Sequence, residues 1–481
     1  MLLKKLLDGI VYEGENVDDI EVKDIKIDSR RVEKGDLFIA IKGQESNGCD
    51  FISDAFKNGA VAVLTEENIK GCIRVSNARS VYALVCKNFF EKACDKFKII
   101  AVTGTNGKTT TCTITRQVLS YAGLRTGIIG TLGAGEDNLS DTGFTTPDPY
   151  ALHKIFKQMK ESGVEYVVME ASAHALALDK LEGISFEVGV LTNITEDHLD
   201  FFGNMDSYSK AKFKLFESGR VKLGIICGDD LYGRRLLLQG NVPMVSYGLG
   251  EGSDFYPVNI CQDENETQFK CIGLGKEFQV KCPLIGDYNV QNVLASIGIC
   301  TVLGVPNELI CLGLSCITPV EGRFNIIKMG GIKVIIDFAH TPDGLEKVLL
   351  SARKITSGKV KVLFGCGGNR DSIKRPIMGK VAEDFSDEVV LTSDNPRFED
   401  PQTIMNEIAQ GMSKPCVKIA DRKKAICEIL SSAQEGDTIV VAGKGGEKYQ
   451  DINGEKIPYN DFDQVYAYFR NQIKQVLEKE N

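Results

Sequence analysis

The chain of 481 residues is predicted to fold into three α/β domains, the central one built on a doubly wound, mostly parallel sheet. Short apolar, β-branched runs alternate with helical stretches along the chain, which is the order of parallel strands joined by crossover helices. The length also corresponds to about three domains of ordinary size. We expect a small N-terminal α/β domain over residues 1–96, a central domain over 97–320 and a Rossmann-like C-terminal α/β domain over 321–481.

The expected elements can be read in chain order from the apolar runs and the turns between them. Strands are expected at residues 25–28, 36–41, 60–64, 98–102, 166–169, 188–191, 223–227, 334–337, 360–364, 388–392 and 438–441. The change of pattern at Phe97 starts the central domain, where a Gly/Thr turn and a helix over 109–122 follow the first strand. A break at 317–319 precedes the C-terminal domain.

The composition excludes several classes of protein. Hydrophobic residues make up 43% and charged residues 26%, the balance of an ordinary globular chain. The net charge is −9 without a basic tail, so we expect no nucleic-acid partner. No apolar run approaches the ~18 residues of a membrane span, so we expect no membrane insertion and a cytoplasmic protein. The fifteen cysteines form no CxxC pair, which indicates reduced thiols rather than a disulfide or zinc framework.

A glycine-rich turn lies between the strand at 98–102 and the following helix. Backbone N–H groups of such a turn can cradle a polyphosphate, with Lys108 reaching the β and γ phosphates and the Thr109 hydroxyl reaching Mg²⁺. The residues predicted to hold a nucleotide here are Gly104, Thr105, Asn106, Gly107, Lys108, Thr109 and Thr110. Val102 stands where the standard P-loop has its first glycine, so an ordinary strand–helix turn remains an alternative.

Two polar clusters follow predicted strands of the central sheet. Glu170 comes directly after the strand at 166–169, and His198 lies beyond the strand at 188–191. Ligands of open α/β sheets bind beyond the carboxyl ends of the strands, so both side chains are expected near the phosphate turn. Oxygen and nitrogen ligands suit Mg²⁺ or Mn²⁺. Taken singly, each residue is better explained by a capping or hydrogen-bonding role, whereas together they favour a metal site.

Lys212 is the lysine that the helical pattern of residues 207–216 turns inward. Positions 208, 211, 212 and 215 share one helix face, which is otherwise Tyr, Ala and Leu. Burial lowers the pKa of a lysine, and a neutral amine can add CO₂ to form a carbamate. The alternative is a lysine whose stem covers apolar surface while its ammonium reaches water.

Together these motifs resemble those of the Mur ligases, ATP-dependent enzymes that add amino acids to the peptidoglycan precursor of the cell wall. The resemblance covers nearly the whole chain and is strongest to the MurE type, which adds diaminopimelate. It is carried by Asp28-Ser29-Arg30 and Gly35-Asp36-Leu37-Phe38, which resemble the UDP-sugar-binding domain, and by segments 145–148, 288–292, 321–323, 337–342, 367–371 and 394–397. The resemblance implies a chain that we expect to be monomeric.

The resemblance also implies cofactors and site residues. ATP and Mg²⁺ are expected, with Lys108, Lys212 and His198 as catalytic residues and a carbamylated Lys212 that helps hold a second Mg²⁺. The implied metal ligands are Thr109, Glu170, His198 and Lys212, and the implied further nucleotide contacts are Asn292, Arg323 and Asp337. The implied acceptor is UDP-N-acetylmuramoyl-L-alanyl-D-glutamate, contacted by Ser29, Thr145, Thr146, Ser172 and Lys180.

The segment Asp394-Asn395-Pro396-Arg397 is the most specific signal, because in this family it accompanies meso-diaminopimelate. This amino acid differs from lysine by a second carboxylate, which a planar guanidinium can hold with two parallel hydrogen bonds. The residues expected to bind it are Arg370, Asp394, Asn395, Pro396, Arg397, Gly443 and Glu447, with Glu447 facing its ammonium group. Outside the resemblance, Asn-Pro indicates only a turn.

The implied reaction is the attack of the D-glutamate carboxylate on the γ-phosphate of ATP, followed by displacement of phosphate by the amino group of meso-diaminopimelate. Alternatives remain open: a Mur-type or folylpolyglutamate-type ligase with another acceptor or amino acid, such as L-lysine, or a P-loop nucleotide switch without ligase activity. Five residues depart from the family's pattern and leave the acceptor preference open. They are Cys49, Ala173, Leu178, Lys180 and Gly446.

Overall fold

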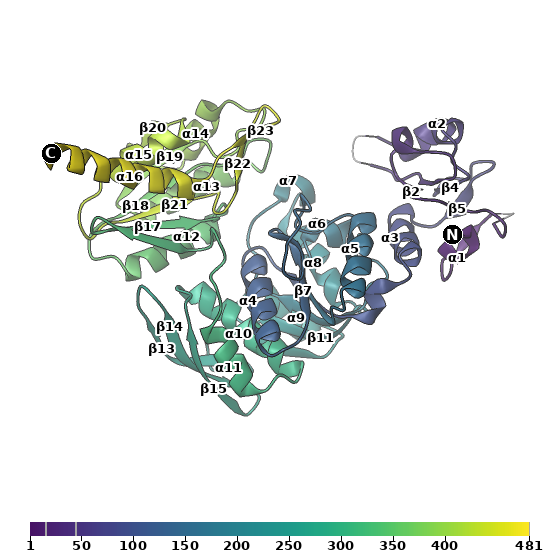
Figure 1. Cartoon of the computed structure of the whole chain (residues 1–481), viewed down its shortest axis with the longest axis horizontal. Coiled ribbons are helices and arrows are strands. Elements are labelled where there is room, and N and C mark those ends of the chain that lie inside the picture. The colour runs from purple at the N-terminus through teal and green to yellow at the C-terminus, as the bar shows by residue number, and fades with distance from the viewer. Residues whose placement is uncertain (15–16, 44–45, 481) are drawn as a thin grey trace.

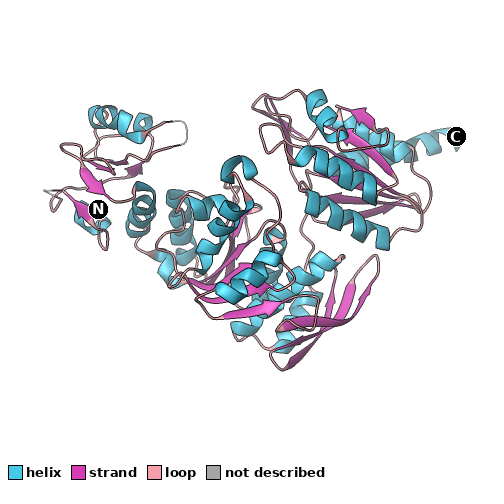
Figure 2. Cartoon of the chain, turned by 180° about the vertical axis from the view of Figure 1, so that it is seen from behind, coloured by secondary structure: helices cyan, strands magenta, loops and turns pink. Residues whose placement is uncertain are grey.

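The computed structural model describes residues 1–14, 17–43 and 46–480, which form three units in chain order (Figure 1). The central unit lies between the other two, and the N-terminal and C-terminal units project from its opposite ends toward the same side (Figures 1 and 2). Each unit has its own sheet and its own hydrophobic core. Within the described residues, no helix has both the length and the apolar character that crossing a bilayer requires.

The N-terminal unit is a small, mostly parallel sheet of short strands in the order β1-β5-β4-β3-β2, in which only β1 and β5 pair antiparallel. Its strands are β1 (Tyr12–Glu13), β2 (Ile25–Lys26), β3 (Leu37–Ile39), β4 (Ala62–Thr65) and β5 (Ile73–Val75). Its helices are α1 (Leu3–Leu6), η1 (Ser29–Arg31), η2 (Gly48–Phe51), α2 (Ile52–Lys57) and α3 (Ala78–Phe89). Helix α3 packs its apolar face into this core through Val81, Tyr82 and Val85, and it also contacts the central unit.

The central unit is built on a sheet whose middle strands are buried on both faces. In β6 (Lys98–Thr103), Ile100 and Val102 pack into one core and Ile99 and Ala101 into the other. Strands covered on both faces read as continuous apolar runs, which is why this segment shows no alternation. The first core includes residues of helices α4 (Lys108–Tyr121) and α10 (Asp287–Val302), and the second includes residues of α5 (Pro149–Glu161).

The order of the central sheet is β15-β14-β13-β12-β11-β10-β6-β9-β7-β8. Its other strands are β7 (Thr126–Gly130), β8 (Gly133–Gly135), β9 (Tyr166–Glu170), β10 (Phe186–Leu191), β11 (Val221–Cys227), β12 (Met244–Tyr247), β13 (Phe255–Gln262), β14 (Thr267–Gly273) and β15 (Lys276–Cys282). Its other helices are η3 (Ala93–Lys96), α6 (Ala173–Ala177), α7 (Leu199–Phe202), α8 (Met205–Phe213), η4 (Lys214–Phe216), α9 (Leu231–Gln239) and α11 (Asn307–Ser315). Because β9 and β10 both pair parallel to β6, the segments that follow these three strands lie at one edge of the sheet.

The C-terminal unit is a six-stranded sheet in the order β16-β17-β21-β18-β19-β20, parallel except for β16. Its strands are β16 (Asn325–Met329), β17 (Ile332–Asp337), β18 (Val360–Phe364), β19 (Glu388–Thr392), β20 (Val417–Ile419) and β21 (Thr438–Ala442), followed by the hairpin β22 (Tyr449–Ile452) and β23 (Glu455–Pro458). Its helices are α12 (Pro342–Lys354), α13 (Lys374–Phe385), α14 (Pro401–Ala409), α15 (Arg422–Ser431) and α16 (Asp461–Glu480).

The predicted fold class is confirmed: α/β units surround a central, mostly parallel sheet covered on both faces. The strand prediction was incomplete, since it included neither β7 and β12 inside the central sheet nor β1, β5, β8, β16 and β20. The antiparallel strands β13, β14 and β15 extend the central sheet, and β22 and β23 form a separate hairpin, and neither was predicted. Strands β14 and β15 largely alternate between buried and more exposed residues, so they carry a period-two signal and not a continuous apolar run.

Candidate active site

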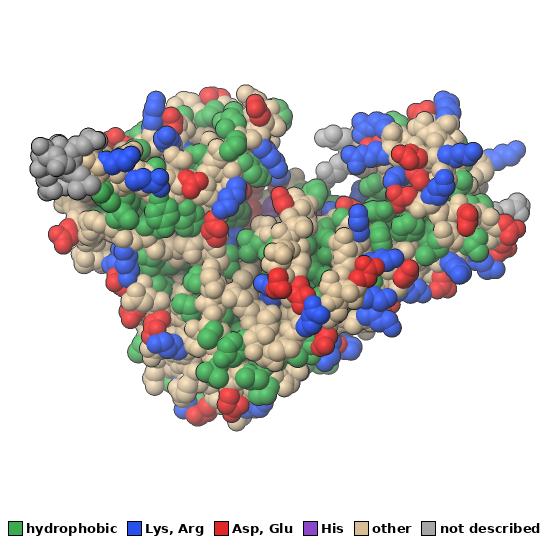
Figure 3. Space-filling view, in the orientation of Figure 1, with side chains coloured by type: hydrophobic (Ala, Val, Ile, Leu, Met, Phe, Trp, Pro, Cys, Tyr) green, Lys and Arg blue, Asp and Glu red, His purple; other side chains and the backbone are tan. Residues whose placement is uncertain are grey.

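A cavity of about 740 Å³ lies between the central and C-terminal units, beyond the carboxyl ends of the central strands. The space-filling view shows the surface hollowed between the outer units, with charged side chains of both signs around it (Figure 3). The predicted site residues that line the cavity are Thr105, Asn106, Gly107, Lys108, Thr109, Thr110, Thr145, Thr146, Glu170, Ser172, Lys180, His198, Asn292, Arg323, Asp337, Arg370, Asp394, Asn395, Arg397, Gly443 and Glu447. Gly104 and Pro396 are next in sequence to lining residues and Lys212 donates a hydrogen bond to Gly104, whereas Ser29 lies in η1 of the N-terminal unit.

The phosphate loop between β6 and α4 is shaped by two glycines. Gly104 has φ +146° and Gly107 has φ +87°, conformations that other residues adopt only with strain. A Cβ atom on Gly104 would lie 1.8 Å from Thr192 Oγ1, and one on Gly107 would lie 2.5 Å from Asn292 Oδ1. The loop therefore packs tightly against α10 and against the residue that follows β10. This packing fixes the backbone N–H groups of the loop at the start of α4.

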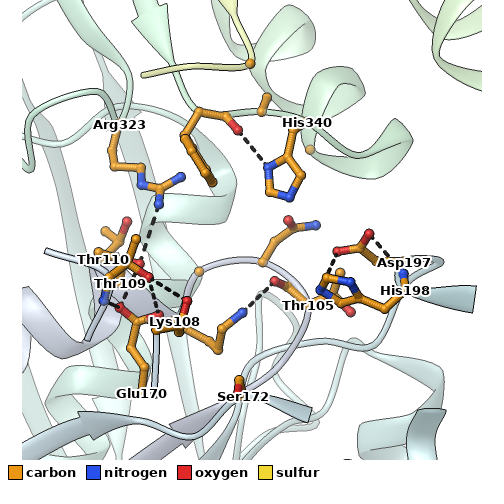
Figure 4. Close-up of a pocket in the computed structure, with 18 of the residues that line it drawn as sticks. Thr105, Lys108, Thr109, Thr110, Glu170, Ser172, Asp197, His198, Arg323 and His340 are labelled. Atoms are coloured by element: carbon orange, nitrogen blue, oxygen red, sulfur yellow. Dashed lines mark hydrogen bonds and ion pairs between the residues drawn. The ribbon is translucent and has the colours of Figure 1, made fainter. Parts of the chain in front are cut away.

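Lys108 is the first residue of α4 and folds back over the loop (Figure 4). Its Nζ donates to the carbonyl oxygens of Gly104 at 3.0 Å and Thr105 at 2.9 Å. Burial lowers the pKa of Lys108, although the nearby carboxylates of Glu170 and Asp197 oppose the shift. This ammonium is already held next to the loop that would surround a polyphosphate.

Glu170, the last residue of β9, meets the phosphate loop as predicted. Its Oε1 accepts hydrogen bonds from Thr109 Oγ1 at 3.0 Å and from the Thr131 N–H at 2.8 Å. The side chain is buried, and a Cβ atom on Gly130 would lie 2.5 Å from its Oε1. A carboxylate and a hydroxyl thus lie side by side at the N-terminus of α4 (Figure 4).

His198 lies across the loop from Glu170, beside Asp197 (Figure 4). Its Nε2 is 3.4 Å from Asp197 Oδ2, and burial lowers the pKa of His198 to about 3, which keeps the imidazole neutral. Burial opposes ionisation of Asp197, but the ammonium of Lys374, 3.4 Å away, outweighs it together with nearby basic groups and holds the Asp197 pKa well below its usual value. A neutral imidazole can act as a metal ligand.

Lys212 lies beneath the phosphate loop and is 1% exposed. The predicted inward face is confirmed, since Tyr208, Ala211 and Leu215 are buried with it. Lys212 Nζ donates to the Gly104 carbonyl oxygen at 2.8 Å and lies 4.4 Å from the centre of the Tyr208 ring. Burial, reinforced by the positive charge of Lys108, lowers the pKa of Lys212 well below 10.5.

Three further predicted nucleotide contacts come from α10 and the start of the C-terminal unit. Asn292 Oδ1 accepts from Thr111 Oγ1 at 3.2 Å, which ties α10 to α4. The Arg323 guanidinium lies 4.2 Å from the centre of the Phe338 ring, and its Nη2 is 3.5 Å from Thr109 Oγ1 (Figure 4). Burial raises the pKa of Asp337 to about 6, against the opposing charge of Arg323.

The C-terminal wall of the cavity is organised around a fully buried lysine. Lys444 Nζ donates to Glu447 Oε2 at 2.7 Å and to Asn395 Oδ1 at 3.0 Å, and Asn395 Nδ2 donates to the same Glu447 oxygen at 2.9 Å. Arg397 has φ +51° and donates from Nη1 to the Gly368 carbonyl oxygen at 2.8 Å. Arg370 is exposed at the cavity.

The remaining predicted substrate residues line the opposite wall. Thr146 Oγ1 donates to the Glu170 carbonyl oxygen at 2.8 Å and accepts from the Ser172 N–H at 3.0 Å, while Ser172 caps α6. Lys180 Nζ lies 5.5 Å from the centre of the Phe144 ring, and burial lowers the pKa of Lys180.

Several polar residues of the cavity were not singled out from the sequence. Asn106 Nδ2 donates to Asp343 Oδ2 at 2.9 Å, and Lys347 Nζ donates to the same oxygen at 2.9 Å. Lys374 reaches Asp197 from α13. The Asn106–Asp343 contact joins the phosphate loop to the C-terminal unit across 237 positions, and the Lys374–Asp197 contact joins the segment after β10 to the same unit, and no local pattern reveals either.

The residues present fit a magnesium nucleotide. A hard cation prefers oxygen ligands, and the Thr109 hydroxyl and the Glu170 carboxylate supply them beside a loop that can cradle phosphates. His198 and Lys212 lie on the other side of the phosphate loop from Thr109 and Glu170. Among the described residues, no three His, Cys, Asp or Glu side chains form a metal-binding group by themselves, so phosphate or other oxygens would have to complete the coordination.

Comparisons with known proteins agree with this geometry. Family models described as the Mur ligase catalytic domain, the Mur ligase middle domain and the Mur ligase glutamate ligase domain match residues 21–90, 102–300 and 322–445. The fold and the site therefore define a ligase of this class, and the chain belongs to the Mur ligase family.

Among its relatives, the chain is 41% identical to the UDP-N-acetylmuramoyl-L-alanyl-D-glutamate–2,6-diaminopimelate ligase of Clostridium perfringens, over 97% of this chain and 99% of the relative. It is also 41% identical to the enzyme of that name from Aquifex aeolicus, over 92% of each chain. A solved structure of a ligase of the same name covers 98% of this chain and 99% of its own, with 30% identity and a TM-score of 0.71.

Proposed function

We propose that this protein adds meso-2,6-diaminopimelate to the D-glutamate carboxylate of UDP-N-acetylmuramoyl-L-alanyl-D-glutamate, forming an amide at the expense of ATP. The similarity to the diaminopimelate ligases of Clostridium perfringens and Aquifex aeolicus extends over nearly the whole chain. One structural observation carries the proposal: a single cavity contains both the phosphate loop and the arginines Arg370 and Arg397. A nucleotide switch would need the loop but not the arginines.

The proposed reaction has two steps. A carboxylate oxygen of D-glutamate attacks the γ-phosphorus of ATP, the bond to the β–γ bridging oxygen breaks, and an acyl phosphate and ADP form. The amino group of meso-diaminopimelate then attacks the acyl carbon, phosphate leaves, and the amine loses a proton. Water would hydrolyse the acyl phosphate, so the site must exclude it.

Residues on the two sides of the cavity have different roles in this reaction. The phosphate loop N–H groups and Lys108 hold the polyphosphate and offset the charge that develops during transfer. Thr109, Glu170 and His198 would hold Mg²⁺, which supplies further neutralisation of phosphate charge when bound. Asn292, Arg323 and Asp337 hold the rest of the nucleotide.

On the other wall, Arg397 and Arg370 bind the distal carboxylate of meso-diaminopimelate, with Asp394, Asn395, Gly443 and Glu447 around its amino group. Thr145, Thr146, Ser172 and Lys180 hold the peptide end of the acceptor. L-lysine lacks the distal carboxylate, so the partly buried guanidinium of Arg397, which lies 3.6 Å from Asp451 Oδ2, would lose the second carboxylate partner that meso-diaminopimelate supplies.

The proposal includes carbamylation of Lys212. Its neutral amine would add CO₂ to form N-carboxylysine and release one proton, and the new carboxylate would serve as a ligand for a second Mg²⁺. The burial of Lys212 and its place under Gly104 support this assignment.

The proposal extends to the organisation of the chain. Residues 1–96 would bind the UDP-sugar through Ser29, residues 97–320 would bind ATP, and residues 321–481 would bind the incoming amino acid, in a monomer. Use of ATP and a UDP-activated sugar favours a cytoplasmic location.

The direct test of this function is the mass of the product. Purified protein is incubated with ATP, Mg²⁺ and UDP-N-acetylmuramoyl-L-alanyl-D-glutamate, with meso-diaminopimelate, L-lysine or L-ornithine in separate reactions. The proposal requires a tripeptide product with diaminopimelate and at least about 100-fold less with lysine, since the charged contact to the distal carboxylate is lost. Formation of product with L-lysine but not with meso-diaminopimelate would contradict the proposal. ATP hydrolysis that requires neither the UDP-linked dipeptide nor an amino acid would also contradict it.

A further inference from the structure

The segment that leaves α6 connects the cavity to the N-terminal unit. Leu178 and Lys180 both line the cavity, and Asp179 between them points its carboxylate toward α3. Helix α3 lies at the border between the two units (Figure 1). Asp179 thus joins the wall that faces the acceptor peptide to a helix of the other unit.

The Asp179 carboxylate has three partners. Its Oδ2 accepts from Ser80 Oγ at 3.1 Å and from Asn77 Nδ2 at 3.2 Å, and its Oδ1 accepts from Lys214 Nζ at 3.2 Å. Asn77 is the N-cap of α3 and Ser80 lies in its first turn. A carboxylate at this end of a helix is favoured by the helix dipole.

The contact continues along one face of α3. A Cβ atom on Gly183 would lie 2.5 Å from Leu84, and Lys87 Nζ donates to the Gly183 carbonyl oxygen at 2.7 Å. Residues 77, 80, 84 and 87 have the spacing of a single helix face, so residues 179–183 dock along α3. Asp179 is the carboxylate of this docking segment that reaches α3, because the Glu182 carboxylate pairs with Arg220 of the central unit instead.

We infer that Asp179 is a positioning residue that fixes the N-terminal unit relative to the acceptor wall of the cavity. This inference rests on the proposed function, in which the N-terminal unit holds the UDP-sugar and the cavity holds the dipeptide of the same molecule. An acceptor bound at both ends gains affinity only when the two parts lie at the correct distance and orientation. Asp179 acts through α3 and Lys180 and does not itself need to contact the acceptor.

The variant Asp179→Gly tests this role, because Asp179 has φ +52°, a conformation that glycine adopts without strain, and the variant also removes the contact with Lys214. It removes the carboxylate and leaves the local backbone intact. Glu182→Ala is the matched control, since it removes an acidic side chain from the same segment without touching α3. Both variants are compared with the unmodified chain by thermal unfolding, by calorimetric binding of UDP-N-acetylmuramoyl-L-alanyl-D-glutamate and of UDP, and by steady-state kinetics.

We expect Asp179→Gly to raise the Kd and the KM for the UDP-linked dipeptide about tenfold, with kcat within about twofold. In Asp179→Gly, the KM for ATP stays unchanged. The Kd for UDP also stays unchanged, because UDP contacts one unit only. The control variant Glu182→Ala has the same constants as the unmodified chain. In a double-mutant cycle, Ser80→Ala adds little once Asp179 is Gly, because the two side chains share one hydrogen bond.

The inference is overturned if Asp179→Gly binds the UDP-linked dipeptide as tightly as the unmodified chain does. It is also overturned if the variant weakens UDP or ATP by the same factor, since the effect would then be a general loss of structure. If the unmodified chain neither binds nor converts the UDP-linked dipeptide, the proposed function itself fails, and this result is distinct from the other two.

Discussion

Lys212 and Lys444 are both almost completely buried, on opposite sides of the cavity, but they have different surroundings. Lys212 is 1% exposed and Lys444 is 0% exposed. Lys444 donates to the Glu447 carboxylate, whereas among the described residues no carboxylate lies within ion-pairing distance of Lys212, whose Nζ donates to a backbone carbonyl oxygen. A buried charge requires a partner of opposite sign.

This difference separates a reactive lysine from a structural one. Burial, reinforced by the nearby positive charge of Lys108, lowers the pKa of Lys212 well below its ordinary value, which favours the neutral amine that the proposed carbamylation requires. Lys444 donates to Glu447 and Asn395 and holds these two side chains in the C-terminal wall of the cavity. Burial alone does not distinguish the two.

The largest expected effect is the loss of catalysis on replacing Lys212. We expect Lys212→Met to lower kcat roughly 1,000-fold, about 4 kcal/mol in the barrier, because a ligand for a metal at the reacting phosphate is lost. Its unfolding midpoint in urea should change little, since Met fills a similar volume and no ion pair is broken. Steady-state kinetics and urea titration measure both quantities, and a variant with more than a tenth of the normal kcat would rule out the carbamate.

The next largest effect should come from Lys444 and should fall on stability. We expect Lys444→Met to lower the free energy of unfolding by roughly 3 kcal/mol, because it leaves the Glu447 carboxylate without its buried partner. The KM for meso-diaminopimelate should rise as Glu447 and Asn395 lose their anchor. Urea titration of Lys212→Met and Lys444→Met in parallel tests the contrast, which would be refuted by equal losses of stability.

His153 is a third buried basic side chain and lies away from the cavity. It extends the comparison to a buried base that has no hydrogen-bond partner among the described residues. It is 0% exposed, neither ring nitrogen has a hydrogen-bond partner in the described structure, and burial, reinforced by Lys87, lowers the pKa of His153 to about 3. The unfolded chain binds this proton at a pKa near 6.5, so stability is lost as the pH falls below that value.

At pH 5 this linkage amounts to about 2 kcal/mol. We therefore expect His153→Leu to lose about 2 kcal/mol less stability between pH 7.5 and pH 5 than the unmodified chain does. Urea titrations of both proteins at the two pH values measure the difference. An identical acid loss in both would mean that the pKa of His153 does not change on folding, which would contradict this account.

The smallest expected effect concerns Arg397. Arg397→Lys keeps the charge but loses the planar pair of donors, so the KM for meso-diaminopimelate should rise about tenfold while the KM for ATP stays constant. Kinetics with each substrate varied in turn provide the measurement. An unchanged KM for meso-diaminopimelate would show that this guanidinium does not hold the distal carboxylate.

The sequence predicted those parts of the structure that have local signals. The phosphate loop, the strands that precede Glu170 and His198, and the inward face of Lys212 all follow from patterns within about ten residues, and the structure has them. The antiparallel strands β13–β15 and the hairpin β22–β23 were missed. The ion pair of Lys374 with Asp197 and the contact of Asp343 with Asn106 were also missed, because only tertiary packing of separate units creates them.

Isotope transfer tests the proposed chemistry most directly. The acceptor is prepared with ¹⁸O in both oxygens of the D-glutamate carboxylate that becomes the amide, and the reaction is run with unlabelled ATP and meso-diaminopimelate. Attack of this carboxylate on the γ-phosphate predicts that each inorganic phosphate released carries one ¹⁸O atom and that the amide keeps the other. Phosphate without label would mean that the γ-phosphoryl group passes to water, and it would contradict the assignment of this cavity as an amide ligase site.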